Sequence, residues 1–241
     1  VPPGLTIIAD VCRYFYDNGR SFPDGLRDEV AEGLAAVEAA TGRRFGQGPQ
    51  ALLLSVRSGA AISMPGMMDT VLNLGISDTT EAALAAETGD ARFARDTHRR
   101  FLEMYGRIVL KAAVPDLDPA AAPADWRAAV AKAAGREVPD DPWVQLEAAI
   151  RAVFDSWDGR RARRYRAHHG IPDDLGTAVT IQAMVFGNAD QNSGTGVLFS
   201  RNPLTGAAEP YGEFLACAQG EDVVSGAHTP EPLAAMAAHH P

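Results

Sequence analysis

The chain has 241 residues, of which 46% are hydrophobic and 22% charged, and its formal net charge is -9. This length suits one large domain or two smaller ones, with enough apolar residues to bury a core without disulfides or a structural metal. The acidic balance argues against a nucleic-acid groove or an anionic membrane surface as partner. No apolar run approaches the roughly 20 residues of a membrane-spanning helix.

The two cysteines, Cys12 and Cys217, lie far apart in the sequence. Neither a disulfide framework nor a zinc knuckle can be built from them, and no residue is assigned as a metal ligand. No secretion signal opens the chain. We therefore expect buried free thiols in a reducing cytoplasm. Because the chain begins without Met and within a motif, we also expect an incomplete sequence.

Residues 1–76 are predicted to form an α+β part. A short strand at 5–8 precedes a helix that Asp10 can cap, and a second helix shows apolar residues at Leu26, Val30, Leu34 and Val37 before it ends at Gly42. Strands are expected at 52–56 and 70–74.

Residues 77–170 are predicted to be a helical subdomain with proline-rich breaks at 115–123 and 138–142. One apolar stripe at helical spacing is expected in the core. It comprises Trp143, Leu146, Ile150, Val153, Phe154 and Trp157. For His98 we expect a surface or helix-end position. The arginines at 160, 161, 163, 164 and 166 are expected on a solvated helix face.

Residues 171–241 are predicted to form an antiparallel-strand part. Strands are expected at 178–186, 197–199 and 211–218, with a polar, glycine-containing turn at 187–196. The tail from Ala234 can begin a helix.

Three segments can carry chemistry. Arg57 leaves a strand beside small residues, so its guanidinium can bind phosphate oxygens, although it could equally pair with a surface carboxylate. The glycines that end the 188–196 segment can cover a polyphosphate or simply form a turn. Glu213 and Glu221, expected near strand ends, can hold Mg²⁺ or ribose hydroxyls, or be merely solvated.

Taken together, these segments resemble the pyruvate phosphate dikinase family. The most specific one is Ser-Met-Pro-Gly-Met-Met-Asp-Thr at 63–70, which we do not expect in the related phosphoenolpyruvate synthases, glucan water dikinases or rifampin phosphotransferases. The matching segments follow the family order and cover nearly the whole chain, apart from a divergent stretch near 112–142. They lie at 54–60, 63–75, 92–94, 99–101, 154–157, 176–188, 193–197, 201–203, 211–215 and 218–224.

The resemblance implies an α+β fold of the ATP-grasp type, with two α+β parts separated by the helical subdomain and ATP clamped between the parts. The family converts ATP, phosphate and pyruvate to AMP, pyrophosphate and phosphoenolpyruvate, through a histidine on a separate swivelling domain. ATP and Mg²⁺ are the implied cofactors, that phosphohistidine domain of the parent chain is the implied partner, and the parent is expected to be a homodimer.

The resemblance also implies residue roles. Arg57 would be the catalytic phosphate clamp, with Arg100 as a less direct helper. A phosphate-side loop would consist of Gly66, Met67 and Met68. The adenine pocket would be lined by Gln182, Met184 and Val185. A glycine-rich lid at 193–196 would include Gly194, Thr195 and Gly196. Glu221 and Glu213 would contact ribose or phosphate-bound metal.

The family's ATP-binding Lys would precede Val1, and its metal-binding acids would follow Pro241. We therefore expect a catalytically incomplete chain with weak or no ATP binding. His228 stands where we would expect Arg, and its surroundings do not resemble the phosphohistidine motif. Two alternatives stay open: a non-catalytic nucleotide-binding or interaction module, and a related dikinase or phosphotransferase with a different acceptor.

Overall fold

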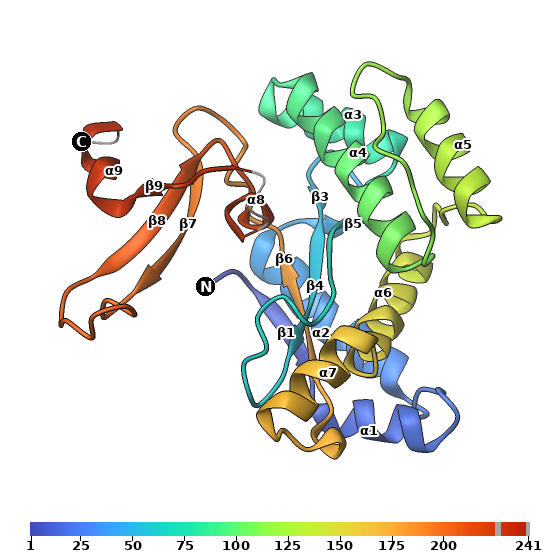
Figure 1. Ribbon diagram of the computed structural model, residues 1–241. Helices are drawn as coiled ribbons and strands as arrows, with labels where there is room; N and C mark the ends of the chain where they lie inside the picture. The colour runs from blue at the N-terminus through green and yellow to red at the C-terminus, as the bar shows by residue number, and fades with distance from the viewer. Residues whose placement is uncertain (225–227, 240–241) are drawn as a thin grey trace. The chain divides into compact units, whose positions relative to one another are not determined.

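The computed structural model describes residues 1–224 and 228–239 (Figure 1). The chain divides into two compact units, Val1–Met184 and Val185–Pro241, which are described separately below. The division after residues 76 and 170 that the sequence suggests stays a prediction. Helices and antiparallel sheets together confirm the α+β class.

The first unit is built on a four-stranded sheet in the order β1-β6-β4-β5, in which every neighbouring pair is antiparallel. Its strands are β1 (Gly4–Ile7), β4 (Leu54–Gly59), β5 (Thr70–Leu74) and β6 (Ala178–Ala183). A separate parallel pair consists of β2 (Arg44–Phe45) and β3 (Ala51–Leu52). We had expected the strand beginning at residue 178 to pair with the following strands. Instead, β6 is inserted between β1 and β4, because its Val179 and Ile181 complete the buried face of this sheet.

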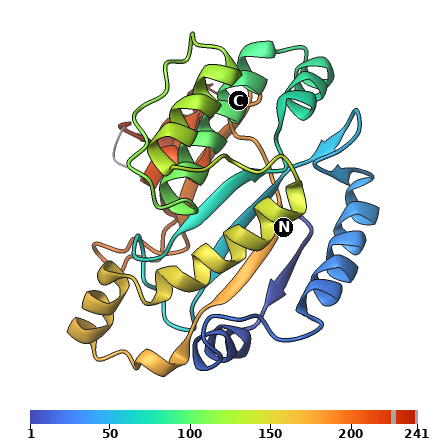
Figure 2. The same cartoon turned by 90° about the vertical axis from the view of Figure 1, so that its right-hand side faces the viewer.

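Seven α-helices of the first unit surround this sheet. They are α1 (Ala9–Asp17), α2 (Leu26–Thr41), α3 (Asp78–Thr88), α4 (Ala91–Ile108), α5 (Pro123–Ala134), α6 (Pro142–Trp157) and α7 (Arg160–His169), followed by the 3-10 turn η1 (Asp173–Leu175). Figure 2 shows α6 crossing the sheet, and it packs on β4, β5 and β6. The predicted apolar stripe of α6 is confirmed for Leu146, Ile150, Val153, Phe154 and Trp157, which are buried, whereas Trp143 in the first turn is half-buried.

Local signals explain where these helices begin and end. In α2, the residues buried at helical spacing are the four predicted, and Gly42 ends the helix in a left-handed conformation. Ser77 caps α3 through its hydroxyl, which accepts a hydrogen bond from the Thr80 amide. Asp90 caps α4 in the same way, and two amide bonds to its carboxylate lower its pKa.

Two side chains in the helical segment differ from expectation. His98 is completely buried, where its Nδ1 lies 2.7 Å from Glu81 Oε2 and its ring packs edge-on against Trp126. Arg166 is also buried, because its guanidinium stacks on the Trp157 ring and binds Asp173. Each of these buried polar side chains therefore has a specific hydrogen-bond partner, although Nε2 of His98 is buried without one.

The second unit contains a three-stranded antiparallel sheet in the order β7-β8-β9. Its elements are β7 (Gly194–Phe199), β8 (Tyr211–Ala216), α8 (Gly220–Val224), β9 (Glu231–Pro232) and α9 (Leu233–His239). Gly212 and Phe214 of β8 are buried, whereas Val197, Leu198 and Phe199 of β7 are exposed. Within the described residues of both units, no helix combines the length and hydropathy needed to span a bilayer.

Candidate functional site

The four-stranded sheet has one apolar face and one polar face. Successive residues of a strand point to opposite faces of the sheet. On β4, Leu54 and Val56 point to the apolar face and are fully buried, whereas Arg57 points to the polar face and is exposed. Residues directly opposite each other on neighbouring strands share a face. The register places Arg57 opposite Thr180 of β6 and opposite Thr70 of β5. Thr180 is in turn opposite Thr6 of β1, and their hydroxyls lie 3.4 Å apart. We call the five residues Thr6, Arg57, Thr70, Thr180 and Gln182 the polar sheet face.

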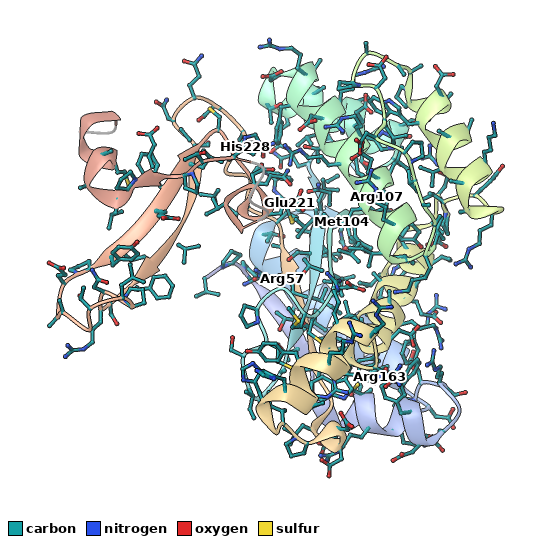
Figure 3. All side chains as sticks on the ribbon, in the orientation of Figure 1. Arg57, Met104, Arg107, Arg163, Glu221 and His228 are labelled. Carbon is teal, nitrogen blue, oxygen red and sulfur yellow. The ribbon has the colours of Figure 1, made fainter. Side chains whose placement is uncertain are left out.

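Arg57 and Gln182 contact each other on this face, and Figure 3 labels Arg57. The guanidinium donates a hydrogen bond to the side-chain oxygen of Gln182, whose amide nitrogen donates to the backbone oxygen of Pro2 at 2.8 Å. Gln182 is buried and fixed by both bonds, whereas Arg57 stays exposed. The expected alternative, pairing with a surface carboxylate, is not found for Arg57 among the described residues. The cation is therefore held in place by a neutral group.

The loop 60–69 joins β4 to β5 and begins three residues after Arg57. Its turn is closed by a hydrogen bond from the Met67 amide to the Met64 carbonyl at 3.1 Å. Gly66 has a φ of 70°, a left-handed conformation that glycine adopts at little cost. Met64 is buried, so the loop packs against the unit on one side while Gly66 is exposed on the other.

Arg100 lies on α4 and forms an ion pair with Asp96 of the same helix. Its Nε donates to Asp96 Oδ2 at 2.7 Å, and Arg99 donates to the other oxygen of the same carboxylate at 2.7 Å. Burial raises the pKa of Asp96, but the hydrogen bonds from these two guanidinium groups outweigh it and the pKa is lowered. Arg100 is thus fixed by an acid, unlike Arg57.

Met184 and Val185 lie at the junction of the two compact units. The Met184 amide donates to the Leu53 carbonyl at 2.9 Å, which extends the β6 pairing by one residue at the end of the first unit. Val185 is the first residue of the second unit, and 70% of its surface is exposed. An exposed valine at such a junction can offer an apolar surface to a flat ring.

In the second unit, the residues of the predicted glycine-rich lid form part of a strand instead of a turn. Gly194, Thr195 and Gly196 belong to strand β7 rather than to a turn, and neither glycine has a positive φ. A Cβ at Gly196 would lie 2.7 Å from the Glu213 carbonyl oxygen, so glycine is required there by the close approach of β8. The turn itself ends at Ser193. Asp190 shapes it by accepting hydrogen bonds from the Ser193 hydroxyl and the Asn192 amide, each at 2.8 Å, which lower its pKa.

The two predicted acids also lie elsewhere than at strand ends. Glu213 is an exposed residue within β8, opposite Val197 and Pro232, and Glu221 lies in the first turn of α8. Among residues 1–224 and 228–239, no group of three His, Cys, Asp or Glu side chains could hold a metal ion. The described residues alone therefore offer no cluster of protein ligands for Mg²⁺.

Sequence reasoning missed Thr6 and Thr180. The segment 178–186 was read as an apolar run, although Thr180 and Gln182 alternate with Val179 and Ile181. That alternation was the available signal for one polar face. The pairing with Thr6 could not be found in this way, because it depends on β6 lying beside β1.

The comparisons with known proteins agree with the motifs. Pyruvate, phosphate dikinase of Rhizobium meliloti (strain 1021) is 50% identical over 253 residues, covering 96% of this chain and 28% of the relative. The chloroplastic pyruvate, phosphate dikinase of Flaveria trinervia is 50% identical over 260 residues, covering 98% and 27%. The chain therefore spans little more than a quarter of the length of these curated relatives. Residues 20–240 match the family described as "Pyruvate phosphate dikinase, AMP/ATP-binding domain", and the chain belongs to this family.

Proposed function

We propose that this chain is the ATP-binding part of a pyruvate phosphate dikinase with an ATP-grasp fold. The whole enzyme would convert ATP, phosphate and pyruvate to AMP, pyrophosphate and phosphoenolpyruvate. Family membership over residues 20–240 and the two relatives at 50% identity support this proposal. Because the chain spans about 28% of such a relative, the remaining steps would take place on other parts of the enzyme.

The observation that carries the proposal is the exposed Arg57 held by the neutral Gln182 on the polar sheet face. A charge-assisted hydrogen bond to phosphate is roughly twice as strong as one between neutral groups. A polyphosphate can therefore replace Gln182 as the partner of Arg57, whereas a carboxylate partner would compete with it. The guanidinium is positioned in advance, so it can neutralise charge that develops on the transferred phosphoryl group.

Other residues would surround this clamp. The exposed backbone of Gly66 and its neighbours Met67 and Met68 would approach the phosphates, and Arg100 would add positive charge. Gln182, Met184 and Val185 would contact the adenine. From the second unit, the strand residues 194–196 with Glu213 and Glu221 would contribute phosphate or ribose contacts. Any Mg²⁺ would arrive with the nucleotide.

The partners of the whole enzyme are also proposals. They are a phosphohistidine domain of the same parent chain and a second subunit in a homodimer. Cytoplasm is the proposed compartment for this chain, and its free cysteines Cys12 and Cys217 support a reducing environment.

Calorimetric titration of Mg·ATP into this chain tests the proposal. Arg57→Ala should weaken binding at least tenfold, since it removes a charge-assisted contact. Arg13→Ala is the matched control, because Arg13 is an exposed arginine that pairs with Asp10 on α1. No heat from the unaltered chain would contradict ATP binding by this part of the enzyme alone. Equal affinity of Arg57→Ala and the unaltered chain would contradict the clamp alone.

A further inference from the structure

The C-terminal end of the loop 60–69 is tied to two helices of the same unit. The Asp69 amide donates to the Ser156 hydroxyl oxygen at 3.2 Å, and that hydroxyl donates to the Val153 carbonyl at 2.7 Å. Met68 Sδ lies 3.9 Å from the same hydroxyl oxygen. Ser156 is buried near the end of α6, so the loop backbone is fixed to a rigid helix.

The Asp69 carboxylate adds a second tie. Its Oδ1 lies 3.1 Å from Arg161 Nη2 on α7, and its Oδ2 lies 3.7 Å from Lys111 Nζ just after α4. The side chain of Asp69 is 17% exposed, whereas those of Arg161 and Lys111 are 68% and 53% exposed. A mostly buried carboxylate is thus neutralised by two cations that reach it from different elements.

These contacts connect two sequence motifs to which the proposed function gives no common role. Asp69 belongs to the Ser-Met-Pro-Gly-Met-Met-Asp-Thr segment, and Ser156 belongs to Phe-Asp-Ser-Trp at 154–157, 87 positions away. The side chains of both residues are largely buried, so neither is well placed to contact a nucleotide. Their shared hydrogen bond gives both a structural role at the base of the exposed turn that contains Gly66.

We propose that Asp69 and Ser156 form an anchor that positions the Gly66–Met68 turn for the nucleotide phosphates. This inference rests on the proposed function, in which that turn approaches the phosphates. Backbone amides act on an anion only if they are held at hydrogen-bonding distance, and a displacement of about 1 Å can cost on the order of a hundredfold in rate. Asp69 is a positioning residue, because its carboxylate is engaged by Arg161 and Lys111 rather than by ligand.

The first test measures the anchor without nucleotide. Deuterium uptake is followed in peptides that cover 60–69 and 142–157 for the unaltered chain, Asp69→Asn, Ser156→Ala and Arg163→Ala. Arg163 is the control, because it lies on α7 two positions from Arg161 and its nearest acid is Asp158 at 3.6 Å (Figure 3). Asp69→Asn and Ser156→Ala should raise uptake in 60–69 several-fold. Unchanged uptake in both variants would overturn the anchor.

The second test compares ATP with adenosine by calorimetry. Asp69→Asn should weaken ATP binding about tenfold and leave adenosine binding unchanged, because only the phosphate-side turn is displaced. Arg161→Ala in the Asp69→Asn background should add little, since both variants remove the same contact. Equal weakening for ATP and adenosine would show general damage and overturn the positioning role. If the unaltered chain binds neither ligand, ATP binding by this part of the enzyme alone fails, and the uptake measurement still decides on the anchor.

Discussion

The guanidinium of Arg57 is hydrogen-bonded to the side-chain oxygen of Gln182, although 125 positions separate the two residues in the sequence. Ser55 lies opposite Gln182 in the register, so Arg57 and Gln182 are diagonal neighbours on one face of the sheet. Gln182 is held by the Pro2 carbonyl at the same time. The position of the proposed phosphate clamp therefore depends on β4, on β6 and on the segment that precedes β1.

Changing the charge of Gln182 should affect ATP binding more than removing its polarity. Gln182→Glu places a carboxylate beside Arg57, which pairs with the guanidinium and repels phosphate, so we expect affinity to fall at least tenfold. Gln182→Leu removes its hydrogen bonds to Arg57 and Pro2 without adding a charge, and a loss of about threefold is expected. Calorimetric titration with Mg·ATP measures both.

Gln47→Glu is the control for this pair of variants, because Gln47 is exposed and the substitution changes the net charge equally. If Gln182→Glu bound ATP as tightly as the control, the polar sheet face would not be the phosphate site.

The buried His98 should make the chain less stable in mild acid. Burial lowers its pKa, partly opposed by the hydrogen bond that its Nδ1 donates to Glu81, while Asp78 and Arg127 are the other charged groups that face it. Since the folded-state pKa lies below the unfolded value of about 6.5, the stabilisation is complete above that value and is lost as the pH falls toward the folded-state pKa.

Urea unfolding at pH 7 and pH 5 tests this effect. The unaltered chain should lose on the order of 1 kcal/mol more than His98→Gln, which cannot titrate but can still donate to Glu81. His169→Gln serves as an exposed control on α7. Parallel losses in the unaltered chain and His98→Gln would show that His98 does not determine the acid sensitivity.

Arg166 should stabilise the fold through packing as well as charge. Its side chain is 1% exposed, its guanidinium lies 4.1 Å from the centre of the Trp157 ring, and its Nε lies 2.7 Å from Asp173 Oδ1. Arg166→Ala should lower the free energy of unfolding by about 2–3 kcal/mol, since it empties this space and leaves the Trp157 carbonyl without a donor. Denaturant titration measures the loss. Arg164→Ala, which changes an exposed arginine on the same helix, should stay within about 0.5 kcal/mol.

Gly196 should be required for pairing of β7 with β8. Because a Cβ there would lie 2.7 Å from the Glu213 carbonyl oxygen, Gly196→Ala must push the strands apart. Gly194→Ala is a milder comparison, with a Cβ at 3.2 Å from the Leu215 carbonyl oxygen. We expect faster deuterium uptake in 211–216 for Gly196→Ala than for Gly194→Ala. The reverse order would contradict this explanation of the glycine.

The sequence predicted those features that local periodicity determines. The helix over Leu26–Thr41 has its apolar residues at helical spacing and a glycine at its end, so its buried face and its boundary were both predicted. The strand Thr70–Leu74 was also placed correctly, because the Met-Pro-Gly turn before it breaks the chain.

The features that were missed depend on distant parts of the chain. The insertion of β6 between β1 and β4 cannot be deduced from the residues of β6 alone, and neither can the pairing of Thr180 with Thr6. His98 looked like a surface residue because its neighbours Arg99 and Arg100 are charged, but the helix turns its ring toward Trp126. Arg57 itself was found from its motif, whereas its partner Gln182 was assigned only to the adenine side.

The central place of β6 has a consequence for synthesis of the protein on the ribosome. Strands β1 and β4 are made early, yet each must wait for β6, which follows five further helices, before the sheet can close. At ordinary translation speed, this delay is on the order of ten seconds. During that time β1 and the β6-facing side of β4 are open strand edges beside apolar side chains, and such edges favour aggregation. The nascent chain should therefore depend on chaperones most strongly just before residue 183 leaves the ribosome.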